Sequence, residues 1–318
     1  MTDPGSSGGG EPADEGAAAF ERLRPTLLAL AYRMLGEVQR AEDIVQDAWL
    51  RWQRHEAKVE SPKAFLIKVV TRLCLNELDS ARARREEGRG DRLPEPLDLD
   101  RSGLDRVEAL DQISMAFIVV LQRLTPAERA VLLLHEVFDF EHDEIADLVG
   151  KSEPACRQLL KRARDHVATE RRALTVAPDV HRRLLRAFLR AATTGDRSAM
   201  AEMLSADVVL VADAGPEGGS YGGVRNVAGP VVGAAKVAAF VASVAPRGAA
   251  GLETFERDLN GQPAIVGMRD GRPSATIQLS VADGRVRAIF IQADPLRLRH
   301  LAVRRGASAP SSPKDFGS

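Results

Sequence analysis

The sequence predicts a multidomain protein in which two all-α helical domains precede an α+β domain built on a curved antiparallel sheet. Three observations lead to this prediction. The first part of the chain carries apolar residues at helical spacing, and one stretch rich in proline and glycine interrupts it. The last part holds three Asn-Gly or Asp-Gly pairs between strand-like runs. A length of 318 residues suits two or three domains of roughly 150 residues each.

Composition and charge limit the function classes that are open. Hydrophobic residues make up 44% of the chain and charged residues 28%, values that are typical of a globular protein and exclude a wholly disordered one. The net charge is −1, so any affinity for nucleic acid must come from local basic patches. Cys74 and Cys156 lie in apolar helical patterns without metal-ligand spacing, which favours a reducing compartment. With no signal-peptide core and no suitable membrane span, we expect a cytoplasmic protein.

The first helical domain is expected over residues 17–87, after a disordered tail at residues 1–16 that is rich in glycine, serine and acid. Ser61 and Pro62 open its last helix, with serine as N-cap and proline at the first helical position. That helix offers a polar and basic set of side chains: Arg72, Asn76, Arg82, Arg84 and Arg85.

An acidic and polar helix face is predicted within residues 41–52. Helical spacing places Asp43, Gln46 and Asp47 together on the exposed side. Trp49 and Trp52 fall on the opposite side, and their spacing with apolar neighbours favours core packing over stacking platforms for bases. An acidic face is usually only solvated, but it can also dock a basic partner.

A linker is expected at residues 88–106, because its glycines and prolines cannot sustain a helix. Helices resume over residues 107–173. There Thr125, Pro126 and Glu128 form a capping box with proline at the first helical position.

Residues 142–168 form a helix-turn-helix pattern, in which a break at Gly150 separates two helices and Ser152 can cap the second. The second helix points polar and basic residues outward: Arg157, Gln158, Lys161, Arg162 and Arg164. Arginine and glutamine can read base edges, and lysine and arginine can pair with phosphates. The alternative is a solvated face on an ordinary helical bundle.

The α+β domain is expected over residues 177–301, followed by a disordered tail at residues 302–318. An apolar strand at residues 208–211 is followed by a helix near residues 231–244. Three tight turns then connect a meander, at Asn260-Gly261, Asp270-Gly271 and Asp283-Gly284. These residue types tolerate the positive φ angles of two-residue hairpins.

The order of acidic helix, basic helix, linker and helix-turn-helix resembles the extracytoplasmic-function (ECF) sigma factors of bacterial RNA polymerase, over residues 17–172. The resemblance implies that Asp43, Gln46 and Asp47 bind the clamp helices of the largest polymerase subunit. It implies that the helix with Arg72 and Asn76 reads and melts the −10 element, with a pocket for an unstacked base in the loop at residues 53–60. The helix-turn-helix would then read the −35 element as duplex, and the linker would let the two domains sit apart on one duplex.

Two further segments resemble the sigma-factor subgroup that carries a C-terminal SnoaL-like domain. Residues 92–97 are similar to its linker signature, with Arg92 where tryptophan is usual, and residues 294–298 are similar to its C-terminal Asn-Pro-Asp-Lys-Leu motif. Asp213 stands where its Asp-Gly-Gly-Gly motif begins, although Ala214 follows. The resemblance implies that the SnoaL-like cone regulates the sigma domains in cis through a defined set of contacts: Pro94, Glu95, Pro96, Asp213, Asp294, Pro295, Arg297 and Leu298.

An enzymatic reading of the cone would need an acid–base group in an apolar cavity. The candidates are Asp207, Asp213, Glu217, Asp258 and His181. We expect Asp207 to belong to a local turn, His181 to lie at the surface, and only Asp213 to reach a cavity mouth. We therefore expect no enzyme activity, no cofactor and no metal site, while a small ligand in the cone stays open.

Two alternatives stay open at this point. One is a conventional helix-turn-helix regulator with a ligand-binding domain, which would bind duplex DNA tightly without polymerase. The other is a polyketide-cyclase-like enzyme tethered to a DNA-binding module, whose turnover would be lost on changing Asp213.

Overall fold

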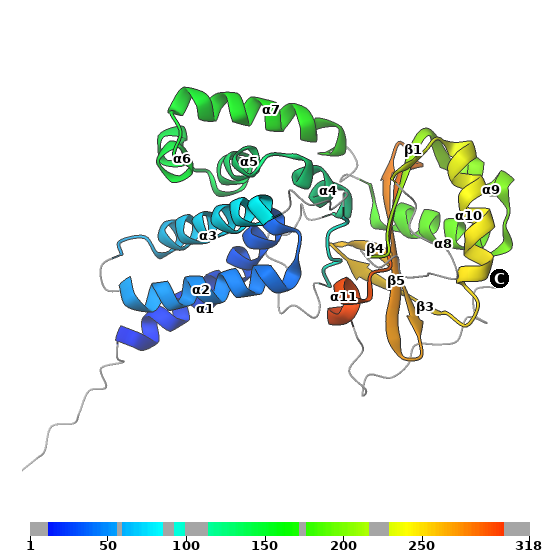
Figure 1. Cartoon of the computed structure of the whole chain (residues 1–318), viewed down its shortest axis with the longest axis horizontal. Coiled ribbons are helices and arrows are strands. Elements are labelled where there is room, and N and C mark those ends of the chain that lie inside the picture. Colours follow the sequence, from blue (N-terminus) through cyan, green and yellow to red (C-terminus); the bar gives the residue numbers. More distant parts are fainter. Residues whose placement is uncertain are drawn as a thin grey trace, which may run out of the picture.

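The computed structural model shows a helical half beside a half built on a six-stranded sheet (Figure 1). It describes residues 12–55, 59–84, 92–98, 114–171, 176–215 and 229–301. Residues 1–11 of the tail expected at 1–16 lie outside the described residues, as do the tail expected at 302–318 and most of the expected linker. Within the described part of the chain, no helix is long and apolar enough to cross a membrane.

Three helices form the first part of the helical half: α1 (Pro12–Leu35), α2 (Val38–His55) and α3 (Pro62–Arg84). The prediction of a disordered tail up to residue 16 is wrong, since α1 already begins at Pro12. Proline suits the first turn of a helix, and the acidic Glu15 suits its positive N-terminal end. The start of α3 is as expected, with the Ala64 amide donating to Ser61 Oγ at 3.4 Å.

Four helices form the second part: α4 (Met115–Arg123), α5 (Pro126–Phe138), α6 (His142–Val149) and α7 (Glu153–Arg171). The predicted capping box is present. Thr125 Oγ1 accepts from the Glu128 amide at 3.3 Å, and Glu128 accepts from the Thr125 amide at 3.0 Å. Gly150 ends α6 with φ of 65°, which makes the break of the helix-turn-helix.

The two helical parts do not sit apart in this structure, because α3 packs against α5 and α6, and α1 packs against α4 and α5. One continuous core of buried side chains runs from α1 to α7. Arg129 of α5 lies inside it, 5% exposed, and donates hydrogen bonds to the carbonyl oxygens of Leu121, Leu124 and Met34. The arginine of one domain thus satisfies a helix end of the other.

The third domain combines three helices with a six-stranded sheet and a short C-terminal helical turn. Its elements are α8 (Pro178–Thr194), α9 (Arg197–Met203), β1 (Leu204–Asp213), β2 (Val231–Val232), α10 (Ala234–Gly248), β3 (Glu253–Leu259), β4 (Gln262–Arg269), β5 (Arg272–Ala282), β6 (Arg285–Gln292), α11 (Pro295–Leu298) and a 3₁₀ turn at Arg299–Leu301.

The sheet has the order β2-β1-β6-β5-β4-β3. Strands β3 to β6 form the predicted antiparallel meander, and β1 joins it parallel to β6. The three predicted turns are present, with φ of 53°, 51° and 53° at Asn260, Asp270 and Asp283. Helices α8 and α10 cover one face of the sheet, while α4 and α11 lie against β5 on the side of the helical half (Figure 1).

Candidate functional site

The predicted acidic face is present on α2. This helix buries Ala41, Ile44, Val45, Ala48 and Trp52, and it leaves Asp43, Gln46 and Asp47 exposed. Leu50 lies on the same face and is also exposed, at a relative exposure of 48%. Sequence reasoning missed Leu50, although its spacing from Asp43 and Asp47 could have revealed it.

The tryptophans of α2 belong to the core, as predicted. Trp52 is 1% exposed, and its Nε1 donates to the Gly16 carbonyl oxygen at 3.0 Å. Trp49 is half-buried, with its ring centroid 4.9 Å from that of Phe20. Trp52 is thus closed to stacking with bases, and Trp49 packs against the core.

Helix α3 exposes Arg72 and Asn76 on the side away from its buried Val70 and Cys74. Arg82 and Arg84 belong to the last turn of the helix, but their side chains are not among those described. Arg85 and residues 56–58 of the expected base pocket lie outside the described residues.

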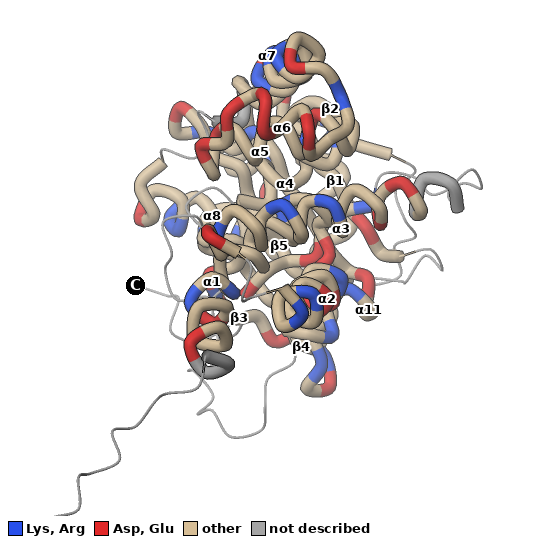
Figure 2. Tube along the Cα trace, turned by 90° about the vertical axis from the view of Figure 1, so that its left-hand side faces the viewer, with Lys and Arg blue, Asp and Glu red and all other residues tan. Residues whose placement is uncertain are grey.

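The outer face of α7 carries every side chain predicted for it: Arg157, Gln158, Lys161, Arg162 and Arg164 are all exposed. Ser152, which is also exposed, directly precedes the helix. Arg157 pairs with Glu153 one turn earlier, and Arg164 pairs with Glu136 of α5 at 2.7 Å. Figure 2 shows the Lys and Arg positions along α7 at the edge of the molecule.

The described linker segment, residues 92–98, is extended and fastened to the third domain. The Leu93 amide donates to Asp213 Oδ2 at 3.1 Å. The Leu97 amide donates to Asn260 Oδ1 at 3.1 Å, and the Asn260 amide returns a bond of 2.7 Å to the Leu97 carbonyl. The side chains of Leu93 and Leu97 are both 2% exposed. This part of the linker is therefore buried structure.

The same segment is also fastened to the first helical domain, through Glu95. Its amide donates to the Gly36 carbonyl at 2.9 Å, and its carbonyl accepts from the Tyr32 hydroxyl at 2.7 Å. Its carboxylate accepts from the amide of Val38, the first residue of α2, at 2.8 Å. Burial raises the pKa of Glu95 above its ordinary value, against the lowering effect of that amide.

Ion pairs surround the junction, that is, the contact of residues 92–98 with the first helical domain and the cone. Arg92 pairs with Asp294, and its Nε lies 3.5 Å from Asp213 Oδ2. Arg297 donates to the Leu93 carbonyl at 2.8 Å and pairs with Glu37 at 2.8 Å. The two acids that Arg92 contacts are 7% and 3% exposed, so this residue compensates buried negative charge.

The C-terminal residues 294–301 also contact the junction. Asp294 caps α11 by accepting from the Leu296 amide at 2.9 Å, and the exposed Pro295 takes the first helical position. Leu298 is fully buried, and His300 Nε2 lies 2.6 Å from the Pro96 carbonyl oxygen.

The structure brings together the residues predicted to form a regulatory contact, and it adds several that sequence reasoning missed. The added residues are Tyr32, Gly36, Glu37, Asn260, Gln292 and His300. None of them belongs to a local motif that would have identified it.

The candidates for acid–base chemistry do not form one cluster, although Asp258 acts electrostatically on His181. Asp207 and Asp258 are exposed and pair with Arg287 and Arg182, while Glu217 lies outside the described residues. The expectation that His181 lies at the surface is wrong: it is 2% exposed, because the face of α8 that packs on the sheet includes it. Burial lowers the pKa of His181 to about 4, so this imidazole is neutral at physiological pH.

Asp213 turns its carboxylate toward the linker. It accepts from Leu93, from Gln292 at 3.3 Å and from the Gly215 amide at 2.9 Å. In the described ranges no group of three His, Cys, Asp or Glu residues could hold a metal ion. Cys74 and Cys156 are buried free thiols.

The comparisons with known proteins define the class first. Residues 19–84 match the family described as Sigma-70 region 2, and residues 114–167 match the family described as Sigma-70, region 4. The protein is thus a promoter-recognising subunit that directs transcription initiation by RNA polymerase. This result removes the alternative of a conventional helix-turn-helix regulator.

Full-length relatives narrow the class. ECF RNA polymerase sigma factor SigJ of Mycobacterium tuberculosis is 36% identical over 306 residues, which cover 92% of this chain and 96% of SigJ. The probable ECF sigma factor SigI of the same organism is 33% identical over 297 residues, covering 92% and 98%. The chain belongs to the ECF RNA polymerase sigma factor family. The crystal structure of SigJ matches with a TM-score of 0.69 at 29% identity, covering 89% of this chain and 98% of SigJ. The third domain has the expected SnoaL-like cone fold.

Proposed function

We propose that this sigma factor binds core RNA polymerase through the exposed face of α2, at the clamp helices of the largest subunit. The exposed stripe consists of Asp43, Gln46 and Asp47, with Leu50 one turn further along the helix. Its two carboxylates suit a basic partner surface, because complementary charges guide encounter, and the exposed Leu50 can add an apolar contact at the end of the stripe. Core RNA polymerase is a cytoplasmic partner, so we place the protein in that compartment.

We propose that two helices read the promoter. Helix α3 would contact the −10 element and its melted strand with Arg72, Asn76, Arg82, Arg84 and Arg85. Helix α7 would enter the major groove of the −35 element with Ser152, Arg157, Gln158, Lys161, Arg162 and Arg164. Because Glu136 already holds Arg164, we expect the strongest base or phosphate contacts from the central Gln158, Lys161 and Arg162.

We further propose that the structure is a resting form that cannot occupy both promoter elements. Helix α5 packs against both α3 and α7, so two helix–helix spacings, about 20 Å in total, separate the two reading helices. The −10 and −35 positions are about 25 base pairs apart, which is roughly 85 Å of duplex at 3.4 Å per pair. The helical domains must therefore separate before the protein can span a promoter.

The SnoaL-like cone is proposed to stabilise this resting form in cis. The observation that carries the proposal is the double attachment of residues 92–98. Their backbone bonds to Asp213 and Asn260 on the side of the cone and to Tyr32 and Gly36 on the side of α1. Residues 92–98 cannot extend while they are held in this way, so we propose that their release from the cone accompanies separation of the domains.

The cone is proposed to regulate without turnover. Among the described residues, Asp213 is the one acidic candidate near a cavity, and both of its carboxylate oxygens are engaged by backbone and side-chain donors. A general base needs a lone pair that faces its substrate. This argues against the alternative of a tethered cyclase.

Transcription from a library of random upstream DNA tests the proposal. We would compare the full-length protein, Arg297→Ala and the matched control Arg272→Ala at an exposed position of β5, each mixed with core polymerase. Selective transcripts that need both components are expected, with a higher yield from Arg297→Ala alone. Equal yields from the three proteins would refute control by the cone. No transcripts and no stable complex with core would refute the sigma function itself.

A further inference from the structure

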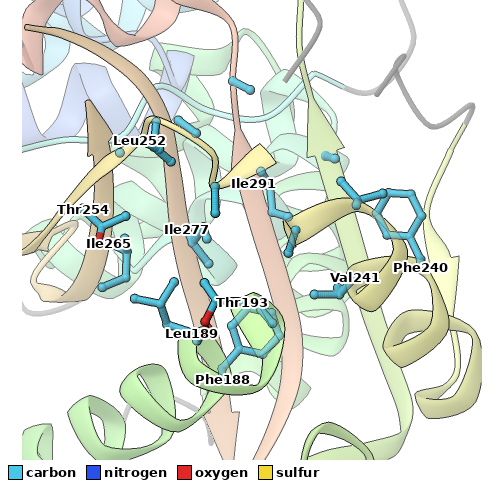
Figure 3. Close-up of a pocket in the computed structure, with 18 of the residues that line it drawn as sticks. Phe188, Leu189, Thr193, Phe240, Val241, Leu252, Thr254, Ile265, Ile277 and Ile291 are labelled. Carbon is cyan, nitrogen blue, oxygen red and sulfur yellow. Dashed lines mark hydrogen bonds between the residues drawn. The ribbon is translucent and has the colours of Figure 1, made fainter. Parts of the chain in front are cut away.

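The cone contains a cavity of about 280 Å³ between the sheet and helices α8 and α10 (Figure 3). Helices contribute Phe188 and Val241, and the strands contribute Ile265, Ile277 and Ile291. This face of the sheet is opposite to the face that binds the linker. Pockets of a few hundred Å³ lined mainly by apolar side chains are typical of small-molecule sites.

The lining offers almost no polarity. Two hydroxyl groups line it, those of Thr193 and Thr254. The Thr193 hydroxyl already donates to the Leu189 carbonyl at 2.9 Å, so toward a ligand it can only accept. Asp213 is the one ionisable lining residue in the described part of the chain, and its carboxylate is held on the linker side by Leu93 and Gln292. A charged ligand would lose its hydration here without gaining a counter-charge.

The cavity has a closed floor and an accessible mouth. Phe188, Ala192 and Val241 are at most 5% exposed and belong to the floor. Val244 and Ala245 of α10 are half-buried, and Thr193 is exposed, so this side leads to solvent.

We propose that the cone binds an uncharged, hydrocarbon-rich small molecule in this cavity and that binding holds the linker in its docked position. The second half rests on the proposed regulation in cis. The strands that line the cavity also hold the linker with their alternate residues. On β6, Ile291 faces the cavity and Gln292 the linker. On β1, Ala212 lines the cavity, and its neighbour Asp213, at the edge of the lining, bonds the linker with its carboxylate.

Strands β1 and β6 contact both the cavity and the linker, and this determines whether a ligand stabilises or releases the docked linker. The cavity is formed while Leu93 is docked on Asp213 and Gln292. A ligand that fits this shape stabilises the strand ends in the arrangement that binds the linker. Because the coupling is reciprocal, the factor by which the ligand stabilises linker docking equals the factor by which linker docking raises the affinity for the ligand. The ligand would therefore act as a signal that keeps the sigma factor at rest.

Two dyes that share one ring system test the binding site. N-phenyl-1-naphthylamine is uncharged, and 8-anilinonaphthalene-1-sulfonate adds a sulfonate. With the full-length protein, we expect saturable one-site fluorescence from the uncharged dye and at least about tenfold weaker binding of the charged one. Equal binding of both dyes, or no binding of the uncharged dye, would overturn the site.

Variants of α10 locate the dye. Ala245→Phe and Val244→Phe fill the mouth from half-buried positions and should abolish binding of the uncharged dye. Ala235→Phe adds the same ring to an exposed position of the same helix, outside the cavity, and should leave binding unchanged. Circular dichroism melting confirms that each variant folds. Unchanged binding in both mouth variants would place the dye elsewhere and reject the site.

The coupling is tested from the linker side. Arg92→Ala, which does not line the cavity, should weaken binding of the uncharged dye several-fold, while Arg287→Ala at the exposed pair with Asp207 should not. The dye should also slow amide exchange at Leu93. Equal dye affinity in wild type and Arg92→Ala would refute the coupling. These readouts need no polymerase, so their failure is separable from failure of the proposed function.

Discussion

The side chain of Asn260, in the turn between β3 and β4, donates a hydrogen bond of 2.7 Å to the hydroxyl of Tyr32 in α1, 228 residues away in sequence. The same hydroxyl donates to the Glu95 carbonyl at 2.7 Å. Asn260 Oδ1 in turn accepts from the Leu97 amide. One buried tyrosine and one buried asparagine thus join the first helical domain, the linker and the cone. Burial raises the pKa of Tyr32 above its ordinary value, so its hydroxyl keeps the proton that it donates.

Removing either side chain should loosen the junction. Tyr32→Phe leaves buried polar groups of Glu95 and Asn260 unpaired, at a cost of about 1–3 kcal/mol in the free energy of unfolding. Asn260→Gly keeps the turn, because glycine accepts the φ of 53°. Urea unfolding of both single variants and the double variant should give a coupling energy of about 0.5–3 kcal/mol. Asp270→Gly, at an exposed turn with φ of 51°, is the control. Additive effects of Tyr32→Phe and Asn260→Gly would show that the bond does not couple the domains.

The sequence was sufficient for features that depend on neighbouring residues. The capping box at Thr125, the outward residues of α7 and the three hairpin turns all follow from local backbone preferences. The exposed face around Asp43 follows from helical periodicity in the same way. Each pattern depends only on residues that are close together in the sequence.

Contacts between distant segments could not be predicted in this way. Tyr32 fits an apolar helical stripe and Asn260 fits a hairpin turn, so each residue already has a local explanation. The basic start of its helix predicts a surface position for His181, yet the imidazole belongs to the packed face of this amphipathic helix. The sequence also carries no local pattern for the packing of the two helical domains against each other. Each domain could fold with the same surface exposed to solvent.

Charge reversal on α2 should weaken assembly with polymerase. The double variant Asp43→Lys with Asp47→Lys changes only exposed side chains, so its stability should stay within about 0.5 kcal/mol of wild type. We expect affinity for core polymerase to fall by about tenfold or more, mostly at low salt, where guidance by charge is strongest. Fluorescence polarisation against salt concentration measures this. Glu21→Lys, exposed on α1, is the control, and an equal loss in that variant would indicate a nonspecific charge effect.

Acid should destabilise the cone through His181. Burial lowers the pKa of this imidazole in the folded protein to about 4, below its ordinary value of 6.5. The unfolded chain therefore binds the proton first, so the contribution of His181 to stability is complete above pH 6.5 and is lost as the pH falls toward 4. One proton corresponds to a slope of about 1.4 kcal/mol per pH unit. Urea unfolding at several pH values should show this slope in wild type and in His55→Leu at an exposed position, and not in His181→Leu. The same slope in all three proteins would contradict the assignment.

Assembly with polymerase and promoter should separate α3 from α7. In the resting form Lys68 of α3 pairs with Glu144 of α6 at 3.4 Å, and α5 packs between the two reading helices. Dyes on Asp79→Cys in α3 and Asp165→Cys in α7, both exposed, should show efficient energy transfer in the free protein. Two helix–helix spacings through α5 keep the two helix axes within about 20 Å. The native cysteines are buried and should resist labelling. Energy transfer should fall sharply once core polymerase and promoter DNA are added.

The control is a pair of dyes within one domain, on Glu42→Cys and Asp79→Cys. This pair should keep its energy transfer, because α2 and α3 pack in one domain and move together. Persistent high transfer across the domains in a transcribing complex would mean that promoter binding does not require the resting form to open.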